Sequence, residues 1–174
     1  MEPLIPVEVE TQRLVLRRPV ESDVEAVVAL FDDPEVVRYL SGEIPTAHEM
    51  WRAVAGWVGH WAWRGYGMTT WVEKATGTIV GRGGLWVPGG WPQLEVGWTL
   101  GRDWWGRGYA TEAAGACLAL AWEHLDPPWI CSVIHPDNVR SQRVARRLGA
   151  TEPDRTETLI GHPVQVWRYE RPDA

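Results

Sequence analysis

Cysteine is scarce in this sequence, because Cys117 and Cys131 are the only two among 174 residues. Both fall inside apolar periodic segments, and neither has partners at metal-ligand spacing. This scarcity excludes a scaffold built on disulfides. The surroundings favour two buried, reduced thiols over a catalytic one.

Long apolar runs are absent as well. No stretch approaches the ~20 residues that span a bilayer, and Met1 to Leu4 lack the basic start and apolar core of a secretory signal. We therefore expect a cytoplasmic protein with no membrane partner. The length and the 45% hydrophobic content are typical of one globular domain, here over residues 1–174.

Positive charge is in deficit, since 17 lysines and arginines face 23 acidic residues and leave a net charge of -6. Nucleic-acid binding needs a basic surface and is not expected. A cationic partner such as an amine remains compatible. The histidines are isolated or, at His135-Pro136, structural in character, so we expect no metal.

Hydrophobic periodicity predicts a mixed α/β chain of six strands and four helices. The predicted strands cover residues 13–18, 68–73, 78–87, 93–100, 129–135 and 164–169. The predicted helices cover residues 22–31, 46–65, 110–124 and 137–148. The three consecutive strands between residues 68 and 100 are separated by short turns, which favours antiparallel pairing.

Helix ends are marked by capping signals. Ser22 with Glu25 and Thr46 with Glu49 match the capping-box pattern. The run from Asp32 to Pro34 is expected to end the first helix, and Pro127-Pro128 the third.

A glycine-rich turn at residues 104–111 joins a strand to a helix, where free backbone N–H groups form an anion site. A Walker loop is not supported, because Arg107-Gly108 follows Gly106 where lysine and a hydroxyl residue are needed. A dinucleotide fold would need glycine or alanine at Thr111 and a βαβ unit. A pyrophosphate held by main-chain N–H groups fits best, although a purely geometric turn explains the motif when it is taken alone.

Together with further motifs, this turn makes the chain resemble a known family. The chain resembles the GNAT superfamily of N-acetyltransferases, and more narrowly the RimJ/RimL-like branch of ribosomal-protein N-acetyltransferases. The resemblance rests on residues 11–14, 94–98 and 105–113, on Asn138 with Ser141, and on Leu148-Gly149. It implies an α+β fold with a mostly antiparallel sheet of about six to seven strands flanked by about four helices. It also implies acetyl-CoA as co-substrate.

The resemblance implies a cofactor site at the glycine turn. Trp105, Gly108 and Ala110 match the family's pyrophosphate pattern, with tryptophan where arginine or glutamine is usual. The implied cofactor-binding residues are Trp98, Thr99, Leu100, Trp105, Gly106, Arg107, Gly108, Tyr109, Ala110, Thr111, Asn138, Ser141 and Arg143. The strand at residues 98–100 is expected to pair with the pantetheine arm as an added strand would.

Two residues are candidates for catalysis. Strand alternation places Glu95 on the face opposite Leu94 and Val96. By itself this pattern favours an exposed strand carboxylate, whereas the family position implies a general base. The other candidate is Ser141.

Ser141 shares a helical face with Asn138, and both residue types also favour helix starts, where Asp137 is another possible cap. The resemblance places Asn138 on the pantetheine and Ser141 near the sulfur. Ala145 stands where many relatives have a tyrosine acid, so Ser141, Tyr109 or water is left for that role.

Arg143 belongs to an arginine stripe that normally faces solvent, and the alternative is a contact with the 3′-phosphate of CoA.

The leading functional hypothesis is acetyl transfer to a primary amine in a ternary complex. The amine belongs to a protein N-terminus or to a small molecule such as an antibiotic or a polyamine. A non-catalytic acyl-CoA-binding module is the competing class. A homodimer is expected if an edge strand is paired or covered.

Overall fold

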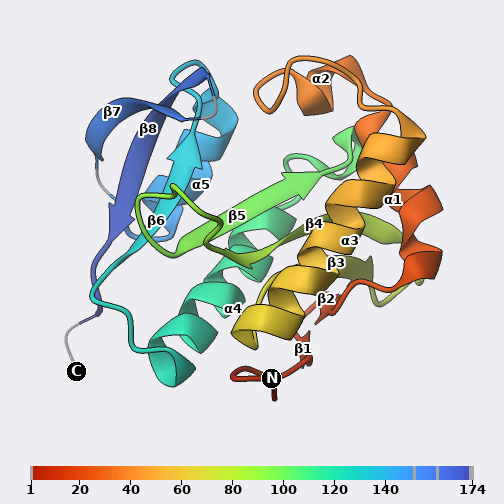
Figure 1. Ribbon diagram of the computed structural model, residues 1–174, viewed down its shortest axis with the longest axis horizontal. Coiled ribbons are helices and arrows are strands. Elements are labelled where there is room, and N and C mark those ends of the chain that lie inside the picture. Colours follow the sequence, from red (N-terminus) through yellow and green to blue (C-terminus); the bar gives the residue numbers. More distant parts are fainter. Residues whose placement is uncertain (1, 151, 160, 173–174) are drawn as a thin grey trace.

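An eight-stranded mixed sheet forms the centre of the computed structural model, which describes residues 2–150, 152–159 and 161–172 (Figure 1). The strand order is β1-β2-β3-β4-β5-β6-β8-β7, and all pairs are antiparallel except β5 with β6. The strands are β1 (Glu8–Glu10), β2 (Leu14–Arg17), β3 (Met68–Glu73), β4 (Ile79–Trp86), β5 (Glu95–Leu100), β6 (Ile130–Ile134), β7 (Pro153–Leu159) and β8 (His162–Tyr169).

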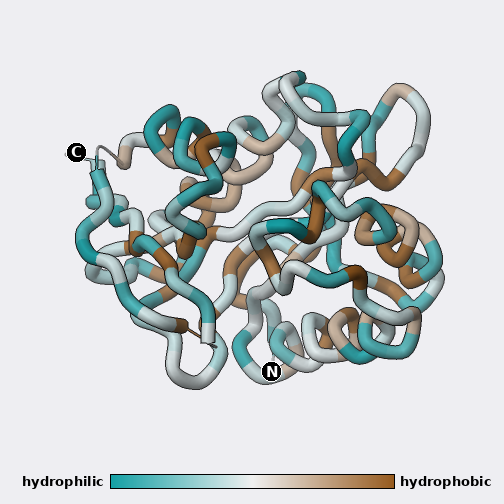
Figure 2. Tube along the Cα trace, turned by 90° about the horizontal axis from the view of Figure 1, so that it is seen from above, coloured by the Kyte–Doolittle hydropathy of each residue, from teal (hydrophilic) through white to brown (hydrophobic). Residues whose placement is uncertain are grey.

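Helices cover both faces of this sheet. They are α1 (Val24–Phe31), α2 (Pro34–Val37), α3 (Ala47–Arg64), α4 (Tyr109–His124) and α5 (Val139–Arg147), with short 3-10 turns at Glu21–Asp23 and Arg102–Trp104. α1 and α3 pack on one face around Val27, Trp57 and Met68. α4 and α5 pack on the other face, where Ala113 and Ala145 join the larger core. Hydrophobic and hydrophilic residues alternate along the helical coils, as one buried helix face requires (Figure 2).

The sheet opens between β5 and β6. Six residue pairs join β4 to β5, but only Glu95 and Cys131 are paired between β5 and β6. Next to that pair, the Cys131 N–H donates to the Leu94 carbonyl at 2.9 Å and the Ser132 hydroxyl donates to the Val96 carbonyl at 2.7 Å. The second half of β5, from Gly97, is therefore not paired with β6.

The fold class predicted from the sequence is confirmed, but the count of elements was too low. Eight strands and five helices stand where about six to seven strands and four helices were expected. The added strands are β1, which has only three residues, and β7, whose burial pattern is mostly exposed. Both are edge strands, and pairing with a neighbour rather than hydrophobic alternation defines them.

One predicted helix cap is wrong, and one helix, α2, was not predicted. The predicted capping box at Ser22 and Glu25 is wrong, because α1 begins at Val24 without a side-chain cap. Pro34 ends α1 as predicted, but it also occupies the first turn of α2, where the Asp33 side chain accepts the Glu35 N–H at 2.8 Å. The capping box of Thr46 and Glu49 is present.

Both cysteines are free and buried, as predicted, and burial raises the pKa of Cys117 to about 12. Within the described ranges, no helix combines the length and apolar character needed to cross a membrane.

Candidate active site

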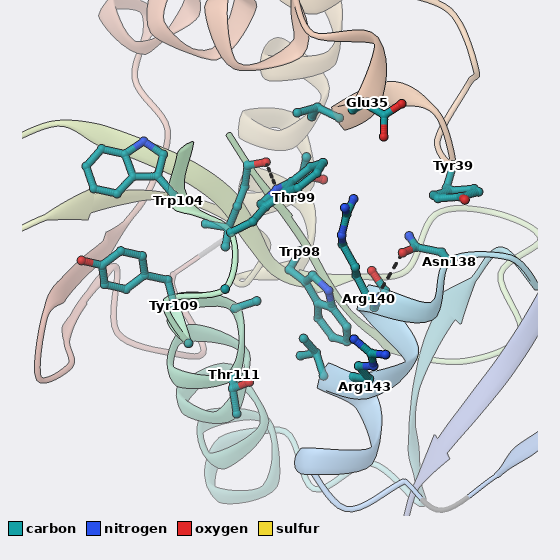
Figure 3. Close-up of a pocket in the computed structure, with 18 of the residues that line it drawn as sticks. Glu35, Tyr39, Trp98, Thr99, Trp104, Tyr109, Thr111, Asn138, Arg140 and Arg143 are labelled. Carbon is teal, nitrogen blue, oxygen red and sulfur yellow. Dashed lines mark hydrogen bonds between the residues drawn. The ribbon is translucent and has the colours of Figure 1, made fainter. Parts of the chain in front are cut away.

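A cavity of about 350 Å³ lies where β5, the glycine turn and α5 meet (Figure 3). We call it the turn cavity. The sequence-predicted residues that line it are Trp98, Thr99, Leu100, Trp105, Gly106, Gly108, Tyr109, Ala110, Thr111, Asn138, Ser141 and Arg143. Figure 3 shows Asn138, Arg140 and Arg143 on the α5 side, with Trp104 and Tyr109 across the opening.

The start of α4 is built to present main-chain donors. Gly108 is the N-cap residue at φ +83° and provides no side-chain cap. Gly106 also has a positive φ, +75°, and no atom lies within 4 Å of where its Cβ would be. A helix start without a cap leaves N–H groups of the first turn free, and the helix dipole favours an anion there.

The start of α5 is capped by its own side chain. Asn138, rather than Asp137, is the N-cap, and its Oδ1 accepts the Ser141 N–H at 3.2 Å. Capping uses the amide oxygen and leaves the NH₂ of Asn138 free for another partner. Ala145 is completely buried in the core, one turn beyond Ser141.

Arginines surround the mouth of the turn cavity. Arg140, Arg143 and Arg147 line it, and the Arg140 guanidinium lies 4.5 Å from the ring centre of Trp105. Arg107 does not line it, although the sequence placed it in the site. Its guanidinium stacks on Trp104 at 4.9 Å.

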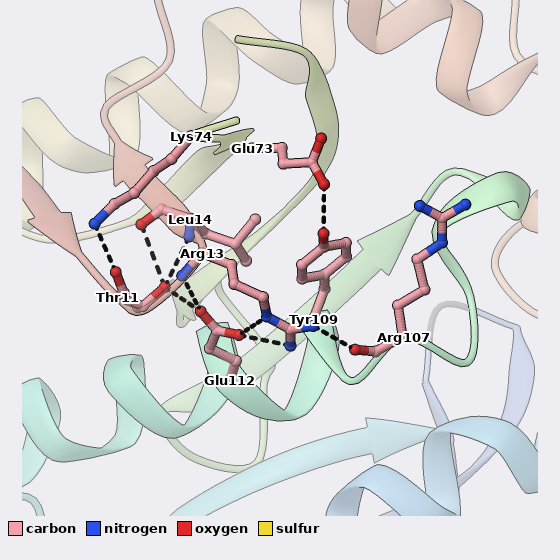
Figure 4. Close-up of polar contacts among 8 residues, drawn as sticks. All are labelled: Thr11, Arg13, Leu14, Glu73, Lys74, Arg107, Tyr109 and Glu112. Atoms are coloured by element: carbon pink, nitrogen blue, oxygen red, sulfur yellow. Dashed lines mark hydrogen bonds and ion pairs between the residues drawn. The ribbon is translucent and has the colours of Figure 1, made fainter. Parts of the chain in front are cut away.

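Tyr109 is committed to a polar network outside the cavity (Figure 4). Its hydroxyl donates to the Glu73 carboxylate, which raises the pKa of Tyr109. The Arg13 guanidinium lies 4.3 Å from the Tyr109 ring centre and is ion-paired with Glu112 at 2.7 Å. Its Nη1 also donates to the Arg107 carbonyl at 2.8 Å. The network ties the glycine turn to β3 and to Arg13, the residue before β2. The Tyr109 hydroxyl points away from Asn138 (Figure 3).

A second cavity of about 430 Å³ lies over the sheet face that carries Glu95, and we call it the sheet cavity. Its walls include Trp57 from α3, Trp86 at the end of β4, and Trp91 from the connection between β4 and β5. The two cavities share Tyr39, Leu40, Trp98, Thr99, Asn138 and Ser141. A molecule in one cavity would therefore meet a molecule in the other beside Ser141 and Thr99.

Glu95 is buried at the sheet cavity, with 8% of its surface exposed. The alternative of an exposed strand carboxylate is therefore wrong. Its Oε2 accepts the Trp91 Nε1–H at 2.5 Å, and its Oε1 lies 3.4 Å from the Val133 nitrogen. Burial raises the pKa of Glu95 above its ordinary value, and these hydrogen bonds with the Arg82 charge only partly oppose the rise. A carboxyl group with a raised pKa in a cleft is a candidate proton acceptor near neutral pH.

Tyr39 and Arg82 are among the cavity-lining residues that the sequence reasoning missed. Tyr39 follows α2, a helix that was not predicted, and its ring lies 5.2 Å from that of His135. Arg82 lines the sheet cavity from the middle of β4. A single arginine in an apolar strand was the only available signal for it.

The prediction of no metal stays a prediction. Among the described side chains, no group of three or more His, Cys, Asp or Glu residues is placed to hold a metal ion. His60 has a structural position, with Nδ1 2.9 Å from the Tyr66 carbonyl and Nε2 accepting the Val87 N–H at 3.3 Å.

Known proteins share both the sequence pattern and the fold. Residues 13–151 match the family model of the acetyltransferase (GNAT) domain. The uncharacterized protein YkkB of Bacillus subtilis is 34% identical over 170 residues, which covers 92% of this chain and 93% of YkkB. An acetyltransferase structure from Agrobacterium tumefaciens superposes with a TM-score of 0.83 at 30% identity, covering 96% of this chain and 95% of the other.

A more distant structure carries the cofactor. RimL, a ribosomal L7/L12 alpha-N-protein acetyltransferase in complex with coenzyme A, has a TM-score of 0.73 at 22% identity and covers 95% of this chain and 97% of its own. At that identity the likeness concerns the fold. Together with the match over residues 13–151, these findings show that the chain belongs to the GNAT acetyltransferase family and is an acyltransferase.

Proposed function

We propose that this enzyme transfers the acetyl group of acetyl-CoA directly to a primary amine, without a covalent enzyme intermediate. The observation that carries the proposal is the meeting of the two cavities at Thr99, Asn138 and Ser141, with a buried carboxylate in one and an uncapped helix start in the other. Family membership supports acetyl transfer in general.

The turn cavity fits coenzyme A by its chemistry. The free N–H groups at the start of α4 would hold the pyrophosphate, and the second half of β5, which is not paired with β6, would pair with the amides of the pantetheine arm. Arg143, exposed at the cavity mouth with Arg140 and Arg147, would neutralise the 3′-phosphate. Bound there, acetyl-CoA supplies the activated acyl group.

The sheet cavity would hold the amine, and Glu95 would remove its proton. Attack by nitrogen requires the neutral amine, so a buried carboxylate with a raised pKa is suited to accept the proton directly or through water. Ser141 lies at the junction of the cavities and would stabilise or protonate the departing thiolate. The Tyr109 hydroxyl is less suitable, because Glu73 already accepts its proton in a hydrogen bond.

The acceptor class, the cellular compartment and the assembly are further parts of the proposal. The RimJ/RimL-like branch, and with it a protein N-terminal amine, is supported by the fold likeness to RimL, while the tryptophan-lined cavity is equally compatible with a small-molecule amine. We further propose that residues 1–174 act as one domain in the cytoplasm, with a homodimer as the expected assembly.

One experiment tests the reaction class. The pure protein is incubated with acetyl-CoA and a mixed panel of amines and peptides, while free thiol release and product mass are followed. Thiol release coupled to an acceptor heavier by one acetyl group is expected. Binding of CoA without any acceptor-dependent thiol release would instead favour the non-catalytic acyl-CoA-binding module.

A further inference from the structure

The sheet cavity contains the guanidinium of Arg82, which forms no ion pair with any described residue. Arg82 projects from the middle of β4 onto the face covered by α1 and α3, where it lies 5.6 Å from the ring centre of Phe31 and 5.1 Å from that of Trp57. The one hydrogen bond of its side chain within the described chain goes from Nη1 to the Met68 sulfur at 3.7 Å, and sulfur is a weak acceptor. These contacts hold the group in place but do not neutralise it.

The other surroundings of Arg82 supply little compensation. No carboxylate of the described residues lies within 4.0 Å of it, and its Nε is inaccessible and has no hydrogen-bond partner. Burial lowers its pKa to about 10, which leaves it charged at neutral pH. A guanidinium that is largely withdrawn from solvent and has no ion-pair partner is costly, so such a site favours an anionic ligand.

Glu95 is the carboxylate that faces Arg82, but it is engaged elsewhere. Its two oxygens interact with Trp91 and Val133. Gly97 keeps space open beside it, since a Cβ there would lie 3.4 Å from both the Glu95 Oε1 and the Met68 Cε. The face therefore offers a carboxylate and a guanidinium around a shared opening, rather than a closed salt bridge.

A second unpartnered donor lies next to Arg82. Thr99 is its cross-strand neighbour, and the Thr99 Oγ1 is buried without a hydrogen-bond partner in the described chain. Thr99 lines both cavities. Two adjacent buried atoms, the Arg82 Nε and the Thr99 Oγ1, both lack an acceptor in the described chain and indicate a ligand with anionic oxygens, because buried polar groups are rarely left unsatisfied.

We propose that Arg82, with Thr99, binds a carboxylate of the acceptor, so that the substrates of this enzyme are primary amines that carry a carboxylate close to the amine and an apolar body. The amine would lie toward Glu95, the carboxylate on Arg82, and the apolar body against Trp57, Trp86 and Trp91. The inference rests on the proposed function only in taking the bound carboxylate compound as the acetyl acceptor. Binding of a carboxylate at Arg82 can be measured without any acetyl transfer.

The binding test uses pairs of ligands that differ in charge but not in shape. Binding of 3-phenylpropionate and 3-phenylpropanamide, and of other carboxylate and amide pairs, is measured by calorimetry on the protein saturated with coenzyme A. The wild type should bind the carboxylates roughly 10- to 100-fold more tightly, as a charge-assisted hydrogen bond provides. Arg82→Gln should lose that preference, and Arg82→Lys should keep part of it. Arg64→Gln, an exposed position on α3, is the control and should behave as the wild type.

Turnover then distinguishes two sources of the carboxylate. Phenylalanine is compared with phenylalaninamide, and a C-terminally blocked peptide beginning with aspartate with one beginning with asparagine. Preference for the free amino acid identifies an α-carboxylate, and preference for the aspartyl peptide an acidic side chain.

Several outcomes would overturn the inference. They are equal binding of every carboxylate and its amide by the wild type, a preference that survives Arg82→Gln in a variant with unchanged thermal melting, or a turnover preference for the uncharged acceptors. Acetylation of uncharged amines alone would leave the proposed function standing. Arg82-dependent carboxylate binding without acetylation of any amine would support the site and contradict the proposed function.

Discussion

Glu95 combines burial, a raised pKa and a place beside the junction of two cavities. Glu95→Gln keeps the shape of the side chain and removes the basic site, so we expect turnover to fall by roughly 10²- to 10⁴-fold while acetyl-CoA affinity is retained. Steady-state rates with the best acceptor and calorimetry with acetyl-CoA measure the two effects. Glu123→Gln, on an exposed residue near the end of α4, is the control.

The pH profile gives a second test of the same residue. The carboxylate form is the active base, so the rate should rise with pH through the ionisation of Glu95. The pKa is raised above the ordinary 4.5, which places this limb on the alkaline side of a normal glutamate titration. In Glu95→Gln the limb should disappear or move toward the pKa of the acceptor amine. Near-parental rates over that range in the variant would show that water or another group removes the proton.

Ser141 lies at the same junction but has a different expected effect. Ser141→Ala should lower turnover by more than it weakens CoA binding, because the hydroxyl is needed mainly as the sulfur becomes negative. The helix cap survives, since Asn138 binds the backbone N–H of Ser141 and not its side chain. Ser141→Thr keeps a hydroxyl and should retain more activity. Unchanged turnover and affinity in Ser141→Ala would reduce Ser141 to a helix-start residue.

At the scale of elements, the start of α4 depends on a backbone conformation that favours glycine. Gly108 has φ +83°, and a Cβ there would lie 3.4 Å from the Arg13 Nη2. Gly108→Val should therefore disturb the turn and abolish CoA binding, at a cost in folding stability of about 1 to 2 kcal/mol. Calorimetry with CoA and thermal melting separate the two effects.

Gly149 provides a matched control for that substitution. It also has a positive φ, +106°, but no atom within 4 Å of its Cβ position, and it lies after α5 outside both cavities. Gly149→Val should lose comparable stability and keep CoA affinity. If Gly108→Val binds CoA as the wild type does, main-chain access at this turn is not what holds the cofactor.

At the scale of the whole molecule, one buried carboxylate joins three segments. Asp23 accepts two hydrogen bonds from Arg17 of β2, at 2.8 and 2.7 Å, and one from the Thr70 hydroxyl of β3 at 2.9 Å. It also accepts the Val20 N–H at 3.0 Å. Burial alone would raise the pKa of Asp23, but these donors lower it below 3.8. Asp23, the residue before α1, thus links that helix to β2 and β3 by hydrogen bonds.

Asp23→Asn should lower the free energy of unfolding by about 2 kcal/mol at neutral pH, because Arg17 loses its charged partner. A depressed carboxyl pKa contributes stability that is present above the unfolded-state value and lost as pH falls through the folded-state value. The difference between wild type and variant should therefore shrink below about pH 3.8. Denaturant titrations across that range measure it, and a difference independent of pH would contradict the electrostatic explanation. Activity per folded molecule should be unchanged.

The sequence alone determined the elements whose signals are local. The strand at residues 93–100, the capped helix after Thr46 and the glycine turn before α4 follow from side-chain alternation, capping chemistry and glycine positions within a few residues. Twelve of the thirteen expected cofactor residues line the turn cavity, because a short motif determines the local backbone conformation of its own residues. Arg107 is the exception, since a turn directs each side chain differently.

Only the tertiary structure decided the rest, because it depends on neighbours distant in the chain. Alternation could assign Glu95 to a face, but it could not show that Trp91 and Val133 of β6 contact its carboxylate or that Glu95 is buried. The edge strands β1 and β7 exist through pairing. Arg82 is one arginine among many in the sequence. That Arg82 has no ion-pair partner among the described residues emerges only when β4, α1 and α3 come together around it, and the proposed carboxylate site rests on that observation.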